Sequence, residues 1–318
     1  MGERIATIDI GTNTALLLIA ESTPGGISEV FNAAGFVRLG EGMDASGRVG
    51  DAALGRLRSV LTSHMEHIRS MDPTRVVVTG TSASRDAADA YRIRDLVREV
   101  TGSDLLILSG EEEAQTTFDG AVCGMMSFDV QWSAVSEHGI VSVIDVGGGS
   151  TELVQGDPES GEIIFKKSID MGSVRMTERF FSTQPVPVNE MDTARSVFQE
   201  MMAVEWADSV TTPACIGASG TAVILGRIQK DVRTLKELAG DSHMSLIQLE
   251  EKTSDILQMT RSKVLSLHPE KMKGREDVFP AGVLILNMAT QFVGGETLYI
   301  SPFGVRHGVA IAEFRKSR

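Results

Sequence analysis

Two stretches of the chain repeat one plan, in which an apolar run ends on an aspartate, turns at glycine and continues as a second apolar run. The first copy runs from Ile5 to Ala20, and the second from Val141 to Val154. Short apolar runs rich in β-branched residues and separated by glycine predict a strand, a tight turn and a strand. Two such hairpins, far apart in sequence, predict two related half-domains that face each other across a cleft.

Between and after the hairpins, apolar residues recur at helical spacing or in short runs that are rich in β-branched residues. Helices are predicted over 51–70, 87–99, 173–181, 189–206, 246–259, 262–267 and 304–316, with a further one opening at 275–282. Strands are predicted over 27–36, 76–78, 105–108, 161–169, 214–217 and 298–300. Asp51 is the expected N-cap of the first helix, and the polar stretch 227–240 is expected at the surface. This alternation of strands and helices predicts an α/β protein.

Composition narrows the possible functions. The chain has 318 residues, of which 42% are hydrophobic, enough to build two cores of ordinary size. Its net charge of −13 argues against a general nucleic-acid or membrane-surface binder. Cys123 and Cys215 show no metal-ligand spacing. With no apolar leader at the N-terminus and no run of about 20 apolar residues, we expect a cytoplasmic protein.

The two turns carry groups suited to phosphate and to a metal ion. Glycines let backbone N–H groups approach phosphate oxygens, so we expect phosphate contacts from Gly11, Thr12, Asn13, Gly147, Gly148, Gly149, Ser150 and Thr151. Asp9, Asp145 and Glu152 are candidate Mg²⁺ ligands, because hard cations prefer oxygen. A plain glycine hairpin is the alternative interpretation of each turn.

A polyanionic substrate also needs local positive charge, because the chain as a whole is acidic. Arg38, Arg85 and Arg175 follow predicted strands on the cleft side and are expected to pair with successive phosphates.

Six motifs occur along the chain in the order seen in one family. They are Asp9-Ile-Gly-Thr-Asn13, Arg38-Leu-Gly40, Thr81 to Arg85, Ser109-Gly-Glu-Glu-Glu-Ala114, Asp145 to Glu152, and Met171-Gly-Ser-Val-Arg175. With these motifs the chain resembles the exopolyphosphatase/guanosine pentaphosphate phosphohydrolase (Ppx/GppA) family, in its short two-domain form. That family belongs to the actin-like ATPase superfamily. His307 stands where a glutamate is common in the family.

The resemblance implies two actin-like (ribonuclease H-like) lobes with the phosphate site between them. The first lobe would comprise residues 1–120 and 304–318, with the final helix crossing back, and the second would comprise 121–303. The resemblance adds Thr81, Gly217, Ser219 and Gly220 to the expected phosphate-binding set. It also implies a homodimer.

The same resemblance assigns the general base to Glu113, the glutamate before alanine in the Ser-Gly-x-Glu-Glu-Ala motif, with Glu112 as the second choice. A helix N-terminus and a nearby Mg²⁺ are expected to hold Glu113 ionised. The alternative for both glutamates is that they are acidic residues at a helix N-terminus with no catalytic role.

The implied function is Mg²⁺-assisted hydrolysis of the terminal phosphate of inorganic polyphosphate or of guanosine pentaphosphate. A nucleotide-dependent kinase of the same superfamily and a non-catalytic nucleotide sensor are the alternatives. The sequence does not choose between the two phosphohydrolase substrates, since both present a terminal anhydride.

Overall fold

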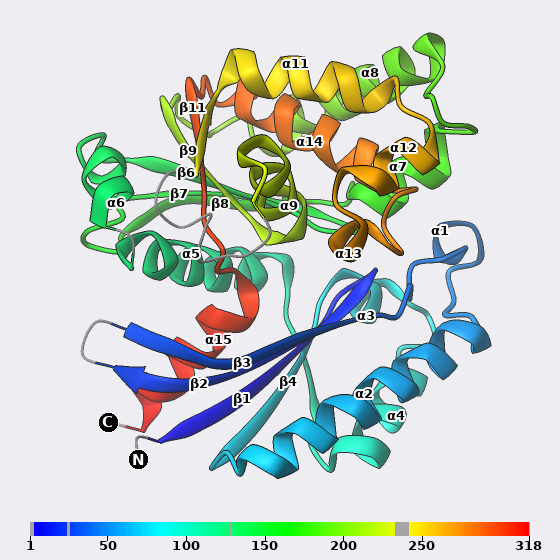
Figure 1. Ribbon diagram of the computed structural model, residues 1–318, viewed down its shortest axis with the longest axis vertical. Helices are drawn as coiled ribbons and strands as arrows, with labels where there is room; N and C mark the ends of the chain where they lie inside the picture. The colour runs from blue at the N-terminus through cyan, green and yellow to red at the C-terminus, as the bar shows by residue number, and fades with distance from the viewer. Residues whose placement is uncertain (1–2, 24–25, 128, 233–241, 318) are drawn as a thin grey trace.

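The computed structural model shows two β-sheets, each built on one of the two hairpins (Figure 1). It describes residues 3–317 apart from 24–25, 128 and 233–241. The first sheet has the strand order β3-β2-β1-β4-β5, and the second has β10-β11-β9-β6-β7-β8. In both, an antiparallel hairpin and third strand are joined on one side by parallel strands, so the second sheet repeats the first. The pairing confirms the predicted α/β class with two related lobes.

The strands of the first sheet are β1 (Arg4–Ile10), β2 (Thr14–Thr23), β3 (Gly26–Phe36), β4 (Arg75–Gly80) and β5 (Leu105–Ile107). Those of the second are β6 (Val141–Val146), β7 (Thr151–Gly156), β8 (Ile163–Ile169), β9 (Ala214–Ala218), β10 (His243–Ser245) and β11 (Thr297–Ile300).

The helices before β6 are α1 (Met43–Ser46), α2 (Asp51–Met71), α3 (Ser82–Asp86), α4 (Tyr91–Thr101), α5 (Gly110–Met126) and α6 (Asp129–Ser136). Those after β8 are α7 (Ser173–Phe180), α8 (Val188–Glu205), α9 (Ser219–Lys230), α11 (Leu246–Leu257), α12 (Arg261–Leu267), α13 (Pro269–Met272), α14 (Phe279–Phe292) and α15 (Val305–Lys316). No helix within the described ranges combines the length and apolarity needed to cross a membrane.

Side-chain alternation along β1 decides what each face of the first sheet contacts. Ala6, Ile8 and Ile10 lie in the core with α2 and α4, whereas Ile5 joins a cluster with α15. Because successive residues of a strand point to opposite faces, Asp9 lies on the same face as Ile5. The aspartate therefore ends the strand on the side that faces the other half of the molecule.

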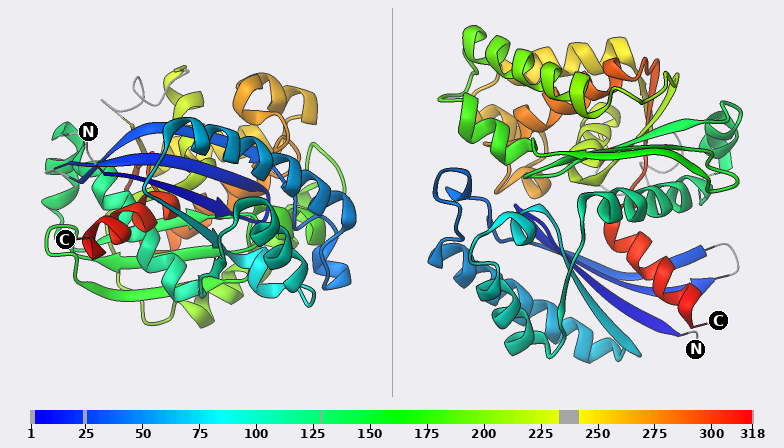
Figure 2. Two further views of the ribbon diagram at one scale, coloured as in Figure 1. Left: turned by 90° about the horizontal axis from the view of Figure 1, so that it is seen from below. Right: turned by 180° about the vertical axis from the view of Figure 1, so that it is seen from behind.

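Two helices lie between the sheets. α15 packs on β1 and β2 of the first sheet, while α5 packs on the second sheet through a cluster that includes Phe118 and Val143. Figure 2 shows both helices between the two sheets, with the chain termini at one end of the strands of the first sheet. The helices touch at the backbone, since a Cβ on Gly308 would lie 1.9 Å from the Thr116 carbonyl oxygen. The predicted lobe boundary at residue 120 lies inside α5, and the division into lobes stays a prediction.

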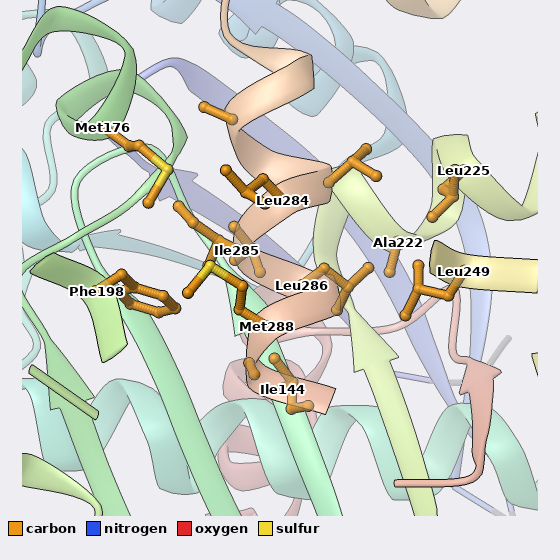
Figure 3. Packing of buried hydrophobic residues seen from close by; sticks show 14 of the residues in the cluster. Ile144, Met176, Phe198, Ala222, Leu225, Leu249, Leu284, Ile285, Leu286 and Met288 are labelled. Atoms are coloured by element: carbon orange, nitrogen blue, oxygen red, sulfur yellow. The ribbon is translucent and has the colours of Figure 1, made fainter. Parts of the chain in front are cut away.

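The other face of the second sheet is covered by the largest core, which is organised around α14 (Figure 3). Leu284, Ile285 and Met288 of this helix reach toward Met176, Phe198 and Ile144 from neighbouring elements. Every residue of α14 from Phe279 to Thr290 is buried. A helix that is apolar all round is expected at such a buried position.

Several element boundaries differ from the sequence prediction. The helix expected over 87–99 begins only at Tyr91, as α4. Loop 47–49 holds the residues before it: the Ala88 N–H donates to the Gly47 carbonyl, and the Val49 N–H donates to the Asp89 carboxylate. Asp51 is the first residue of α2 and Gly50 is its N-cap.

The helix expected to open near 275 begins at Phe279. The polar stretch 227–240 is not all surface, because Arg227 lies in α9 and is buried. Its positions 233–240 lie outside the described residues.

Candidate active site

A cavity of about 380 Å³ lies between the halves and is lined by both hairpin turns. The turn of the first hairpin contributes Gly11 to Thr14, and that of the second contributes Val146 to Ser150. Glu113, Asp9 and Asp145 line it as well. The structure thus brings together segments that are more than a hundred residues apart in the sequence.

The two turns have the same backbone geometry. The Gly11 N–H donates to the Thr14 carbonyl at 2.9 Å, and the Gly147 N–H donates to the Ser150 carbonyl at 3.0 Å. Carbonyl groups of each turn accept backbone hydrogen bonds from the segment that follows the third strand of the same sheet. Thr12 and Asn13 accept from residues 37–40, and Gly147 and Gly148 accept from residues 173–175. Backbone hydrogen bonds on the side away from the cavity therefore hold each turn in place.

The tips of the turns touch, which explains two of the three successive glycines. A Cβ at Gly148 would lie 2.8 Å from Thr12 Cβ, and one at Gly149 would lie 2.3 Å from Ser82 Oγ. Neither distance is compatible with a side chain, so both positions require glycine. The triple glycine is a condition for the close approach of the two halves.

Four carboxylates from different elements lie near the turns. Asp145 and Glu152 are directly opposite on β6 and β7, an arrangement of like charges that destabilises a sheet. Asp9 is the penultimate residue of β1, and Glu113 lies in the first turn of α5; all four side chains are buried.

Burial and mutual repulsion change how these groups ionise. Burial is the main cause that raises the pKa of Glu152 to about 8, and the neighbouring charge of Asp145 adds to it. Burial likewise raises the pKa of Asp9 to about 7, although the positive charge of Arg306 opposes the shift. Groups so perturbed in a cavity are typical of functional sites.

Glu113 and Glu112, the two candidates for the general base, have different surroundings. Burial, followed by the charge of Glu152, raises the pKa of Glu113 well above its ordinary range, while Arg85 acts to lower it. Arg85 Nη1 lies 3.1 Å from Glu113 Oε2. Glu112 is exposed and forms a capping box with Ser109, accepting from the Ser109 N–H at 2.8 Å. Of the two, Glu113 lines the cavity, and burial is the largest influence on its pKa.

None of the three arginines predicted to bind phosphate lines the cavity. Arg38 Nη2 donates to the Asp277 carboxylate at 3.0 Å and to the Gly274 carbonyl. Arg175 pairs with Asp86 at 2.8 Å and with Asp44 at 3.3 Å. Arg38 and Arg175 thus form ion pairs between segments of the two halves outside the cavity, while Arg85 forms an ion pair with Glu113.

Four other cationic side chains line the cavity instead: Arg227, Lys271, Arg275 and Arg306. Burial lowers the pKa of Arg275 to about 10 and lowers that of Lys271, so removal from water is the dominant influence on both. Arg275 also stacks over the Phe36 ring at 5.3 Å. Sequence reasoning missed these residues because it followed the motifs. The basic run from Lys271 to Arg275 was the available signal.

A model of the Ppx/GppA phosphatase family matches residues 18–317 of the chain. The chain belongs to this family. Among curated relatives, it is 30% identical to exopolyphosphatase 2 of Mycobacterium tuberculosis over 97% of this chain and 98% of the relative. It is 24% identical to a guanosine-5'-triphosphate,3'-diphosphate pyrophosphatase of Vibrio atlanticus, over 98% of this chain and 60% of the relative.

Solved structures agree on the fold. An exopolyphosphatase from Cytophaga hutchinsonii has a TM-score of 0.87 at 23% identity, with 99% of this chain and 98% of that chain covered. The Aquifex aeolicus Ppx/GppA family member has a TM-score of 0.79 at 22% identity, with 99% of each chain covered. These neighbours support the two-domain actin-like architecture that the sequence predicted.

In this Ppx/GppA member, the other predicted phosphate-binding residues divide into two groups. Thr81 and Gly220 line the cavity. Thr151 is buried in β7 and donates to the Met171 carbonyl at 2.6 Å, and Gly217 lies in β9, where a Cβ would lie 2.8 Å from Ala222 Cβ. The side chain of Ser219, the first residue of α9, lies outside the described side chains.

The carboxylates fit a cation that takes only some of its ligands from protein. Asp9 Oδ1 is buried and accepts no hydrogen bond from any described group, so one oxygen is available. Within the described ranges, however, no three acidic, histidine or cysteine side chains converge into a ready metal site. Mg²⁺ keeps several waters and is commonly held by one or two carboxylates together with substrate phosphates, which suits this set.

Proposed function

We propose that this Ppx/GppA member hydrolyses the terminal phosphoanhydride of inorganic polyphosphate or of guanosine pentaphosphate, with Mg²⁺ as cofactor. The observation that carries the proposal is one cavity that is lined near its turns by the carboxylates of Asp9, Glu113 and Asp145 and on its walls by four cations. The cations suit a chain of phosphates, and the carboxylates suit a bound Mg²⁺ and the water that attacks the terminal phosphate. The names of the two relatives, an exopolyphosphatase and a guanosine pentaphosphate pyrophosphatase, support the same two substrates.

Substrate binding is assigned to the turns and to the basic walls. The backbone N–H groups of the two turns would hold the terminal phosphate from both sides, as in other glycine-rich anion sites. Arg275, Lys271 and Arg306 would pair with the phosphates that follow. Because the transition state of phosphoryl transfer is loose, positioning and charge neutralisation supply most of the catalysis.

Glu113 is proposed to accept the proton of the attacking water. The group must be ionised for this role, and Arg85 at 3.1 Å favours its ionised form. Mg²⁺, when bound by Asp9, Asp145 or Glu152, would supply positive charge that stabilises the ionised carboxylates and the phosphate oxygens.

Comparison of Glu113→Gln with Glu112→Gln tests the mechanism. General base catalysis is worth about 10²–10⁴-fold, so Glu113→Gln should lower kcat by that range with little change in KM. Glu112→Gln is the matched control, since it changes the adjacent glutamate and affects the capping box only. Equal losses in both variants would contradict the assignment of the base.

The substrate is tested by phosphate release from long polyphosphate, short polyphosphate and guanosine pentaphosphate, each with Mg²⁺ and with excess chelator. Activity in chelator would contradict the metal assignment, and transfer of phosphate to or from a nucleotide acceptor would contradict hydrolysis. The homodimer implied by the sequence also stays a prediction, for which light scattering gives the mass in solution.

A further inference from the structure

The segment 301–307, which leads into α15, places one charged residue in the cavity and the next residue in the core. Arg306 lines the cavity. His307 is fully buried between the halves of the molecule. The hydrogen bonds of His307 belong to no part of the site described above.

His307 makes one hydrogen bond with each ring nitrogen. Nδ1 accepts from the Gly304 N–H at 3.1 Å, which caps the start of α15. The ring lies flat on Phe303, with centroids 4.0 Å apart and an interplanar angle of 5°. Burial and the charge of Arg306 lower the pKa of His307 to about 4, so the ring is neutral. Because Nδ1 accepts, the proton is on Nε2.

Nε2 donates to Glu29 Oε1 at 2.7 Å. Glu29 comes from β3, at the bulge where Ala20 of β2 is opposite it. The second carboxylate oxygen accepts from Asn32 Nδ2 at 3.0 Å, and Asn32 itself lines the cavity. The pair therefore links the start of α15 to the first sheet at the cavity wall.

The backbone of Arg306 is also hydrogen-bonded to β1. Its carbonyl accepts from Thr7 Oγ1 at 3.0 Å, two residues before Asp9. Burial lowers the pKa of Arg306, although the negative charges of Glu29 and Asp9 oppose this shift. The Nε atom is buried without a hydrogen-bond partner among the described groups, so the guanidinium retains a donor that its protein neighbours do not use.

We propose that Glu29 and His307 are positioning residues that fix the backbone of Arg306, so that its guanidinium lies beside Asp9 and meets a phosphate of the bound substrate. This inference rests on the proposed function only for the chemical class of the ligand. His307 fixes the first turn of α15, Glu29 fixes His307 to the first sheet, and Thr7 fixes the Arg306 carbonyl. Arg306 alone touches the ligand.

A double-mutant cycle tests this arrangement. The variants are Glu29→Ala, Arg306→Met and the double variant, with Glu29→Gln as the conservative replacement that still accepts from His307 Nε2. Binding of imidodiphosphate, a non-hydrolysable phosphoanhydride analogue, is measured by calorimetry, and kcat and KM for tripolyphosphate are measured in parallel. Glu313→Gln is the control for loosening of α15, because Glu313 joins the other end of this helix to Arg75 on β4 at 2.5 Å.

Arg306→Met should raise the imidodiphosphate Kd by about 10- to 100-fold, the usual range for one charged hydrogen bond. Glu29→Ala should raise it by about tenfold in the native background and not at all when Arg306 is already Met. Glu29→Gln should recover most of the loss, and Glu313→Gln should leave Kd unchanged.

Multiplicative losses in the double variant, or an Arg306→Met protein with native Kd, would overturn the inference. If Glu29→Ala fails to fold, His307→Gln is measured by itself in its place. Gln retains an acceptor and a donor at position 307, so on the proposal Kd stays within a few-fold of native; a loss as large as that of Arg306→Met would overturn it. A protein that binds imidodiphosphate through Arg306 but releases no phosphate would refute the proposed function and leave this inference standing.

Discussion

Replacing Glu152 by Gln should make the metal-free protein more stable at alkaline pH while removing its activity. Glu152 is fully buried opposite Asp145, and its pKa is raised from 4.5 to about 8. A carboxyl whose pKa is raised on folding destabilises the folded state as pH rises from the unfolded to the folded pKa. The amide cannot ionise, so the variant lacks this cost.

The magnitude follows from the shift. Near pH 7.5 about three pKa units separate the pH from the unfolded value, and each unit corresponds to about 1.4 kcal/mol, so the cost is about 4 kcal/mol. Ser168 Oγ, which donates to Glu152 Oε1 at 2.8 Å, can donate to the amide oxygen as well. Loss of the Glu152 charge also removes the second-largest cause that raises the pKa of Glu113, which adds to the gain.

The assay is urea unfolding with chelator at pH 5, 6.5 and 8, followed by circular dichroism. The difference in unfolding free energy between Glu152→Gln and the native protein should be near zero at pH 5 and should rise by several kcal/mol at pH 8. Saturating Mg²⁺ should reduce the difference, because a bound cation stabilises the ionised carboxylate. A difference that is independent of pH, or a variant less stable than the native protein at pH 8, would refute the reasoning.

Three further predictions follow from the same site. Arg85→Met should move the acidic limb of the kcat–pH profile to higher pH, since Arg85 lowers the pKa of Glu113. If the limb does not move, Arg85 does not influence the ionisation of the catalytic base. Gly149→Ala should lower kcat/KM at least tenfold while its circular dichroism spectrum stays that of the native protein, because the added Cβ would lie 2.3 Å from Ser82 Oγ. Full activity would mean that catalysis does not depend on the close contact of the two halves at this glycine. Arg275→Met should raise KM for tripolyphosphate about tenfold with a smaller change in kcat, whereas Arg261→Met, on the exposed pair with Glu276, should change neither.

The sequence by itself determined the two hairpins and what they carry. A strand that ends on Asp9 or Asp145 and turns through glycine is a local pattern, so periodicity and turn chemistry were enough to predict it. The repeat of that pattern predicted two related lobes, because each copy needs its own sheet. Glu113 was selected by the family resemblance of its motif, and its role as the base stays a prediction.

The tertiary structure alone decided which cations reach the cavity. Arg38, Arg85 and Arg175 lie in the motifs, yet carboxylates from distant segments engage them. Arg275 and Arg306 reach the cavity only because α14 and α15 fold back against it. An ion pair depends on neighbours in space, and one sequence does not record which of its 43 acidic residues will lie beside a given arginine.

The same limit applies to ionisation and to the division into lobes. The helix N-terminus and a nearby Mg²⁺ were expected to hold Glu113 ionised, whereas burial beside Glu152 raises its pKa. Likewise, α5 follows the first sheet in sequence and packs on the second, because its apolar face fits that core. Burial and packing are properties of the assembled chain, so these points could be decided only by the fold.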